Sequence, residues 1–226
     1  PIKKKPKKKI LFILTYFYAG GTERVIFNLS EKLIKKNCDI TIISLQTFHK
    51  SYEIPKYIKT ETLSTEKSIF YRLPKFFIFH AFIKIINVIK LLRHFNKMKT
   101  KLDKFDLILN QETVVLPTFA LKKSTKNKIF LWVHNARHIK LKTKLKRWMY
   151  KKRLDGTKII TVSQGVKNFL KQCNVKAKII KTIYNPFDIK LITELSKKPN
   201  TQIPSESYII HAGIFCPQKR HDRLLK

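Results

Sequence analysis

The chain has 226 residues and carries 49 Lys and Arg against 14 Asp and Glu, so its formal net charge is +35. Hydrophobic residues make up 43% of it, which excludes a mainly disordered chain, and the 5 Gly and 9 Pro exclude collagen-like or low-complexity architectures. The length suits one complete domain and part of another. The charge indicates an anionic partner, which would be nucleic acid, an anionic membrane surface or a negatively charged substrate.

The three cysteines, Cys38, Cys173 and Cys216, lie far apart in the sequence. Neither a disulfide framework nor a CxxC metal site follows from that spacing, which favours a reducing cytoplasm. We interpret each cysteine as a small buried hydrophobic residue.

Residues 1–8 hold so many like charges that we expect a solvated basic arm. The apolar run at 10–14 is too short to span a bilayer. It follows the arm as in a signal peptide, but the helical pattern that begins soon after favours a buried strand. Strand-like and helix-like segments then alternate without hairpin turns, which predicts an α/β doubly wound parallel sheet covered on both faces. The strands are expected at residues 10–14, 39–45, 105–109, 128–134, 158–162 and 178–184. The helices are expected at residues 22–36, from the third strand through Ala120, at 141–154 and at 165–172.

Residues 9–186 therefore form the first expected domain, because this stretch holds a complete alternation of strands and helices. Residues 187–206 are expected to form a hinge and linker, with a helix at 189–197. A new strand at 207–213 would begin a second domain at residues 207–226. One strand cannot close a core, so we expect this second domain to be truncated.

Candidate site residues lie where the strands end, since ligands of doubly wound sheets bind beyond the carboxyl ends of the strands. Gly20 and Gly21 precede the first helix, whose N-terminus offers N–H groups to an anion, although a tight turn also explains them. His134 follows a strand, where an imidazole can bind a ligand or exchange protons with it; the alternative is a structural histidine. Ser163 follows the next strand and is explained as the N-cap of a helix.

Five motifs follow one another along the chain. The first is Gly-Gly-Thr-Glu-Arg at residues 20–24, with Asn-Leu-Ser-Glu-Lys-Leu at 28–33. It is followed by His134, Val-Ser at 162–163, Tyr-Asn-Pro-Phe-Asp at 184–188 and Gly-x-x-x-Pro-Gln-Lys-Arg-His-Asp at 213–222. In their order these motifs resemble those of family-four glycosyltransferases, whose signature at the first motif is Gly-Gly-x-Glu-Arg. The resemblance implies the GT-B architecture, in which two Rossmann-like domains face each other across a cleft. It also implies sugar transfer from a nucleotide sugar with retention at the anomeric carbon, and no metal or other cofactor.

The resemblance assigns roles to matching positions. Gly20, Gly21 and Thr22 would bring backbone N–H groups to the donor diphosphate or to the acceptor. His134 would be the catalytic residue that contacts the donor sugar. Asn185 would mark the hinge into the second domain.

In the second domain, Lys219 corresponds to a diphosphate-binding lysine. The family's arginine is replaced by Ile214, and Arg220 is the candidate to substitute for it. The family's paired glutamates and its base and ribose contacts lie further along the second domain than residue 226. We therefore expect the chain to be an inactive fragment.

Residues 75–98 are mostly apolar, with a polar stripe that includes Lys84, Lys90 and Lys97. This pattern suits a helix lying in the headgroup plane of a membrane, with those lysines as membrane-binding residues, or a helix packed on the sheet. Residues 140–153 add a second basic helix with 8 Lys and Arg and no acid. Each basic residue near an anionic leaflet contributes about 1 kcal/mol, which favours peripheral attachment to the inner face of the cell membrane.

We therefore expect the N-terminal, acceptor-side domain of a bacterial-type retaining glycosyltransferase. Its partners would be a nucleotide sugar, a lipid-linked or glycan acceptor of surface polysaccharide or lipopolysaccharide synthesis, and an anionic membrane surface. One alternative is a basic nucleic-acid-binding protein. The charge supports it, but no zinc-finger spacing or RRM signature does, so we expect no nucleic-acid partner. The other alternative is a non-catalytic membrane-binding scaffold.

Overall fold

The computed structural model describes residues 6–15, 20–44, 54–62, 99–111, 121–135, 143–199, 206–211, 213, 215 and 220–224. The chain divides into two compact units, Pro1–Phe187 and Asp188–Lys226. The expected helix at 75–98, with Lys84, Lys90 and Lys97, lies outside the described residues, as do residues 112–120.

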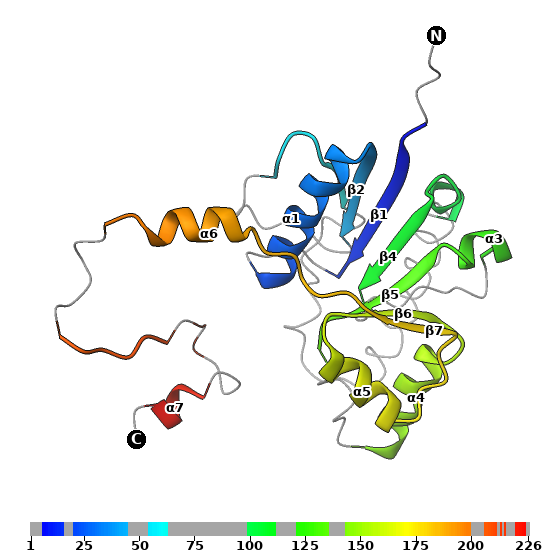
Figure 1. The fold of residues 1–226 in the computed structure, drawn as a ribbon. Coiled ribbons are helices and arrows are strands. Elements are labelled where there is room, and N and C mark those ends of the chain that lie inside the picture. Colours follow the sequence, from blue (N-terminus) through cyan, green and yellow to red (C-terminus); the bar gives the residue numbers. More distant parts are fainter. Residues whose placement is uncertain are drawn as a thin grey trace, which may run out of the picture. The chain divides into compact units, whose positions relative to one another are not determined.

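The described residues of the first unit form a parallel sheet whose seven strands have the order β3-β2-β1-β4-β5-β6-β7 (Figure 1). The chain forms β1, β2 and β3 towards one edge and then returns to place β4 on the other side of β1. The strands are β1 (Lys8–Leu14), β2 (Cys38–Ser44), β3 (Lys59–Thr62), β4 (Leu107–Gln111), β5 (Ile129–Val133), β6 (Lys158–Thr161) and β7 (Ile179–Thr182).

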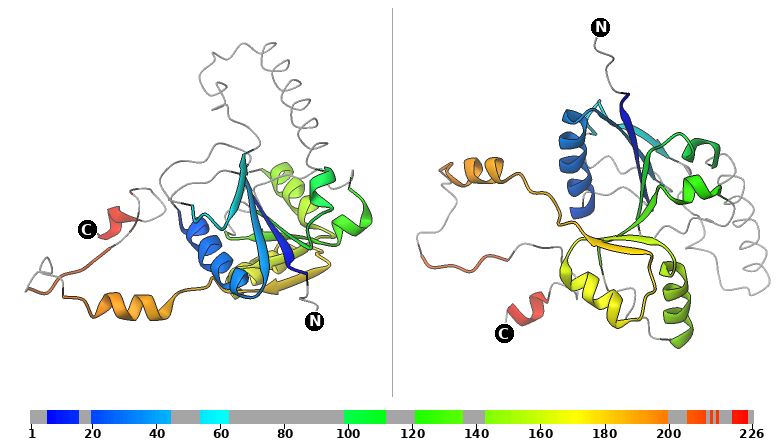
Figure 2. Two further views of the ribbon diagram at one scale, coloured as in Figure 1. Left: turned by 90° about the horizontal axis from the view of Figure 1, so that it is seen from above. Right: turned by 45° about the vertical axis from the view of Figure 1, so that its right-hand side comes forward.

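Helices cover both faces of this sheet. Among the described residues of the first unit, the helices with defined bounds are α1 (Gly21–Lys35), α3 (Lys123–Lys126), α4 (Lys144–Leu154) and α5 (Gln164–Gln172), and residues 99–102 are also helical. Val25 and Ile26 of α1 pack in one cluster with Trp132 of β5. Leu131 and Val133 of the same strand point to the opposite face, where they pack with α4 and α5. Figure 2 shows α1 and α4 on opposite sides of the strands. The predicted α/β, Rossmann-like doubly wound class is therefore confirmed.

The central strand β1 is buried on both of its faces, as its continuous apolar run predicts. Phe12 and Leu14 pack in the cluster that contains α1, whereas Leu11 and Ile13 pack in the cluster on the opposite face. All four side chains are buried. Cys38 is also buried and Cys173 partly buried, and both are free thiols as expected. Cys216 lies outside the described residues.

Three expectations about the strands need correction. β1 begins at Lys8, inside the expected basic arm, because it pairs with β2 along its whole length, starting at Cys38. The backbone N–H of Lys9 also donates to Asp106 Oδ2 at 2.8 Å. β3 was not expected, because its sequence Lys-Thr-Glu-Thr has no apolar residue. The expected strand at 207–213 is wrong for the part that the structure describes.

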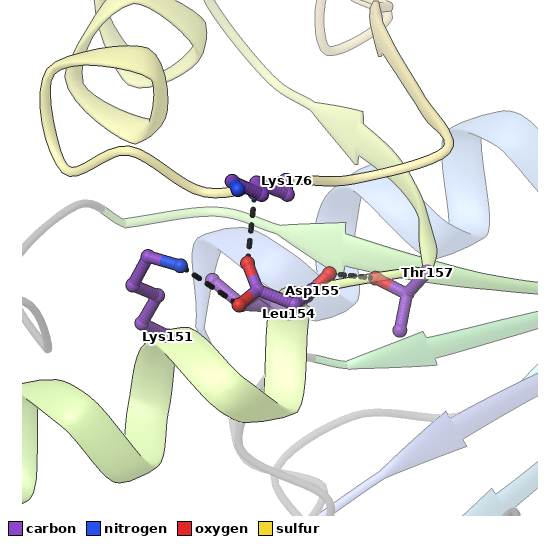
Figure 3. Close-up of polar contacts among 5 residues, drawn as sticks. All are labelled: Lys151, Leu154, Asp155, Thr157 and Lys176. Atoms are coloured by element: carbon purple, nitrogen blue, oxygen red, sulfur yellow. Dashed lines mark hydrogen bonds and ion pairs between the residues drawn. The ribbon is translucent and has the colours of Figure 1, made fainter.

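A compact turn joins α4 to β6 (Figure 3). The Asp155 carboxylate accepts hydrogen bonds from the backbone N–H of Lys176 and from Lys151 Nζ, both at 2.8 Å. These bonds hold the pKa of Asp155 below its usual value. Gly156 has φ +70°, a conformation that favours glycine, and Thr157 Oγ1 donates to the carbonyl of Leu154 at 2.6 Å. The turn thus ties the end of α4 to the segment that follows α5.

The second unit contains α6 (Ile189–Ser196) and α7 (His221–Leu224), and no strand among its described residues. Asp188 caps α6, because its Oδ1 accepts from the backbone N–H of Leu191 at 3.1 Å. The expected strand does not form in the described residues 207–211, where no described strand pairs with the chain and Ile209 and Ile210 are 84% and 81% exposed. No helix in the described part of the chain has the length and apolar character needed to cross a membrane.

Candidate functional site

Polar side chains gather where the strands of the first unit reach their carboxyl ends. Three of these side chains form two hydrogen bonds between neighbouring strands. Gln111 Oε1 accepts from the backbone N–H of Thr15 at 3.1 Å, and the hydroxyl oxygens of Thr161 and Thr182 lie 3.0 Å apart. The residues that give this edge its polar character are Thr15, Ser44, Asn110, Gln111, His134, Thr161 and Thr182. Since all the strands are parallel, these residues share one edge of the sheet.

The strand order reverses between β1 and β4, and the bond from Thr15 to Gln111 crosses that point. Ligands of doubly wound sheets bind in the crevice at such a reversal. Sequence reasoning missed Gln111, since only the pairing of β4 with β1 places it beside Thr15.

Gly20 is the N-cap of α1, with extended backbone, and its carbonyl accepts from the backbone N–H of Arg24 at 3.2 Å. Gly21, Thr22 and Glu23 form the first turn of α1, whose N–H groups have no partner within the helix. A Cβ on Gly20 would lie 2.7 Å from Glu23 Oε2, whereas a Cβ on Gly21 would have no described atom within 4 Å. Space is therefore tight beside Gly20 and open beside Gly21.

Glu23 was not among the expected site residues, although it is buried at the start of α1. Its carboxylate lies against Gly20, at the positive end of the helix dipole, where negative charge is stabilised. The sequence does hold a signal for it, because a glutamate three residues after the N-cap has the spacing of a capping box. The missing side chain at Gly20 therefore leaves room for the Glu23 carboxylate, and the N–H groups of the same turn could in addition bind an anion.

His134 follows β5 directly, and its ring centroid lies 4.3 Å from that of buried Trp132. Burial lowers the pKa of His134 to about 4, because the charged imidazolium loses its hydration. The imidazole is therefore neutral at pH 7. A neutral ring can donate and accept hydrogen bonds, but with this pKa it is a weak proton acceptor, so the geometry favours hydrogen bonding to a ligand over proton transfer.

Ser163 caps α5 as predicted, because its Oγ accepts from the backbone N–H of Val166 at 3.2 Å. Asn185 lies in the segment after β7, partly buried. Asn28 of α1 reaches the same segment and donates from Nδ2 to the carbonyl of Pro186 at 3.5 Å. The helix that follows the glycine turn therefore contacts the expected hinge, while the role of Asn185 stays a prediction.

The other expected diphosphate contacts, Lys219 and Arg220, belong to the second unit. Arg220 is exposed and its guanidinium binds the carboxylate of Asp222 at 2.8 and 3.1 Å. Lys219 and Ile214 lie outside the described residues. In the described part of the chain, no group of three or more His, Cys, Asp and Glu is placed to hold a metal ion.

The described parallel sheet is Rossmann-like, and its carboxyl edge is polar. Domains of this fold class commonly bind nucleotides at that edge. Residues 19–191 match Glycosyltransferase Family 4, and because the match covers more than half of the chain, the chain belongs to that family.

Two solved structures are similar over most of this chain. One is an alpha-glucosyltransferase in complex with UDP and a 13-mer DNA containing a central A:G mismatch, with TM-score 0.45 and 12% identity, covering 84% of this chain and 44% of that one. The other is a glycosyltransferase from Rickettsia africae ESF-5, with TM-score 0.45 and 18% identity, covering 86% of this chain and 51% of that one. The chain thus spans about half the length of these structures. No curated protein matches the sequence.

Proposed function

We propose that the chain is the N-terminal, acceptor-side domain of a retaining glycosyltransferase that moves a sugar from a nucleotide sugar to a membrane-linked glycan acceptor. The acceptor class we propose is surface polysaccharide or lipopolysaccharide at the cytoplasmic face of the membrane. The observation that carries the proposal is the match to Glycosyltransferase Family 4 over residues 19–191. The polar carboxyl edge beside the strand reversal supports it independently.

The start of α1 suits the anionic part of the donor or of the acceptor. The N–H groups of its first turn and its dipole favour a phosphate group. Glu23 fills the space beside Gly20, so a ligand would approach beside Gly21, where no described atom lies within 4 Å of the Cβ position. The net charge of +35 raises the local concentration of a nucleotide diphosphate around the molecule.

His134 suits the sugar itself. Because burial lowers its pKa to about 4, the imidazole is uncharged at neutral pH and can hydrogen-bond to a sugar hydroxyl. Glycosyl transfer develops positive charge at the anomeric carbon, as glycoside hydrolysis does. An imidazolium beside that carbon would oppose the charge, whereas a neutral imidazole does not.

The test is transfer from a panel of labelled nucleotide sugars to membrane acceptors, measured in the protein that carries this chain. His134→Ala should abolish most transfer while the melting temperature changes little. Asn127→Ala is a matched control, because Asn127 is exposed next to the amino end of β5, at the opposite edge of the sheet. Near-normal turnover of His134→Ala would contradict the assignment, and no transfer from any donor by the wild-type protein would contradict the function.

The proposal includes a transfer that needs no metal, as the family resemblance implies. Treatment with a chelator should therefore leave the rate unchanged. A rate that falls on chelation and returns on addition of a divalent cation would contradict this part.

A further inference from the structure

The first two turns of α4 expose three large apolar side chains. Leu145, Trp148 and Met149 are 65%, 57% and 58% exposed, and their spacing of three and four residues places them on one side of the helix. The opposite side carries Tyr150 and Leu154, which are buried against the sheet. The sheet therefore does not cover this apolar face. Neighbouring exposed apolar side chains of this size mark an interaction site.

The same helix is strongly basic. Its sequence, KLKRWMYKKRL, contains six Lys or Arg residues and no acidic residue. Lys152 Nζ lies 5.9 Å from the centre of the Trp148 ring, so charge and aromatic surface occur together. We define the α4 patch as the three apolar residues together with three exposed basic residues that flank them: Lys144, Arg147 and Lys152.

The chemistry of the α4 patch selects its partner. A second copy of this chain would bring the same positive charge against it, and with a net charge of +35 the two copies repel each other. Nucleic acid offers phosphates but no continuous apolar surface for Leu145 and Met149. An anionic bilayer offers both, since phosphates line its surface and hydrocarbon lies just beneath, and Trp is enriched at that boundary.

The α4 patch also has a fitting position in the fold. The chain leaves the carboxyl end of β5 at His134, and α4 then runs back towards the amino end of β6 at Lys158. The first turns of α4 therefore lie towards the same edge of the sheet as His134. A membrane in contact with the α4 patch would be on the side of the candidate site.

We propose that the α4 patch docks the protein onto the surface of an anionic phospholipid bilayer, with Leu145, Trp148 and Met149 inserted at the level of the headgroups. The inference rests on the proposed function in one respect, because it names the surface that would bring a membrane-linked acceptor to the site. It involves residues other than Lys84, Lys90 and Lys97.

Tryptophan fluorescence gives a direct test, because the chain has only two Trp, and Trp132 is buried at 5% exposure. Vesicles of phosphatidylglycerol and phosphatidylcholine with brominated acyl chains should shift the emission to the blue and quench it. Trp148→Phe should still bind these vesicles but lose both changes, since only Trp132 remains. Vesicles of phosphatidylcholine alone should produce neither change.

Two sets of variants locate the contact. Leu145→Ser, Trp148→Ser and Met149→Ser together should lower the vesicle partition coefficient by about tenfold or more. Tyr57→Ser with Ile179→Ser is the matched control, because these residues are 52% and 48% exposed on other surfaces, and it should bind normally.

Charge is tested in the same way. Changing Lys144, Arg147 and Lys152 together to Gln should lower the partition coefficient by about a hundredfold. The control set changes three exposed lysines to Gln: Lys32 on α1, Lys36 directly after α1 and Lys171 on α5. This set should lower the partition coefficient much less.

Four results would overturn the proposal. The first is that brominated lipid does not quench Trp148 fluorescence, and the second is that the α4 and control variants lose the same factor in vesicle partition coefficient. The third is that the protein binds duplex DNA more strongly than vesicles at the same salt. The fourth is that the protein is an oligomer without lipid and that the triple Ser variant dissociates this oligomer. The readout does not depend on catalysis. Quenching of Trp148 in a protein without transferase activity would overturn the proposed function alone, and transferase activity without quenching would overturn this inference alone.

Discussion

Lowering the pH from neutral towards 4 should weaken the fold through His134. Burial sets the pKa of this imidazole at about 4 in the folded chain, against 6.5 for an unperturbed histidine. The difference of about 2.5 units corresponds to about 3 kcal/mol, at 1.36 kcal/mol per unit. A folded domain is stable by only about 5–15 kcal/mol, so this loss would be large.

The sign follows from which state binds the proton. Above pH 6.5 the imidazole is neutral in both states and costs nothing. Below that value the unfolded chain takes up a proton that the folded chain refuses, so stability falls by up to about 1.4 kcal/mol per pH unit. The fall ends near pH 4, where the folded state also binds the proton.

The assay is urea unfolding of wild type and of His134→Gln at about pH 7, 6, 5 and 4.5. Gln does not titrate, so the difference between the two curves isolates His134 from carboxylates that both proteins share, such as Asp155. We expect the wild type to lose about 2–3 kcal/mol more than the variant between neutral pH and the lowest value. Parallel curves would refute the reasoning, as would an NMR titration of the His134 ring with a midpoint near the unperturbed value.

Further predictions concern single substitutions at four residues. Gly21→Ala should leave stability unchanged or raise it by up to about 1 kcal/mol, because Ala favours the helix and space is open there. Gly20→Ala should be the less stable of the two in urea unfolding, because Ala is a poorer N-cap than Gly and its Cβ, 2.7 Å from Glu23 Oε2, would displace the end of that side chain; equal stabilities would contradict this reasoning. Ser163→Ala should cost about 1 kcal/mol by removing the N-cap of α5, and Ser163→Asp should recover most of it in thermal unfolding. Gly156→Ala should cost about 1 kcal/mol because φ is +70° there, and Gly156→Asn should cost less; the reverse order would argue against strain.

The sequence alone determined the elements that bury apolar surface. The run at residues 10–14 has no polar residue, so it had to become a strand buried on both faces, and the apolar spacing that begins at Thr22 could only bury its face as a helix. Local chemistry also determined the N-cap at Ser163, since a cap depends on the next few residues alone. The positions of Gly20, Gly21 and His134 in the candidate site were predictable for the same reason, because these residues stand at element boundaries that periodicity locates, while their roles stay predictions.

Tertiary structure decided what depends on a neighbour distant in sequence. β3 is a strand because the edge of β2 offers hydrogen bonds to Lys59–Thr62, whereas residues 207–210 have strand-forming side chains but no partner strand among the described residues, and form no strand. The bond between Thr15 and Gln111 exists because β4 returns to pair with β1, and strand order has no signature in local sequence. The neutral state of His134 also comes from burial in the folded chain, because the pKa of an imidazole depends on how far the atoms packed around it remove it from water.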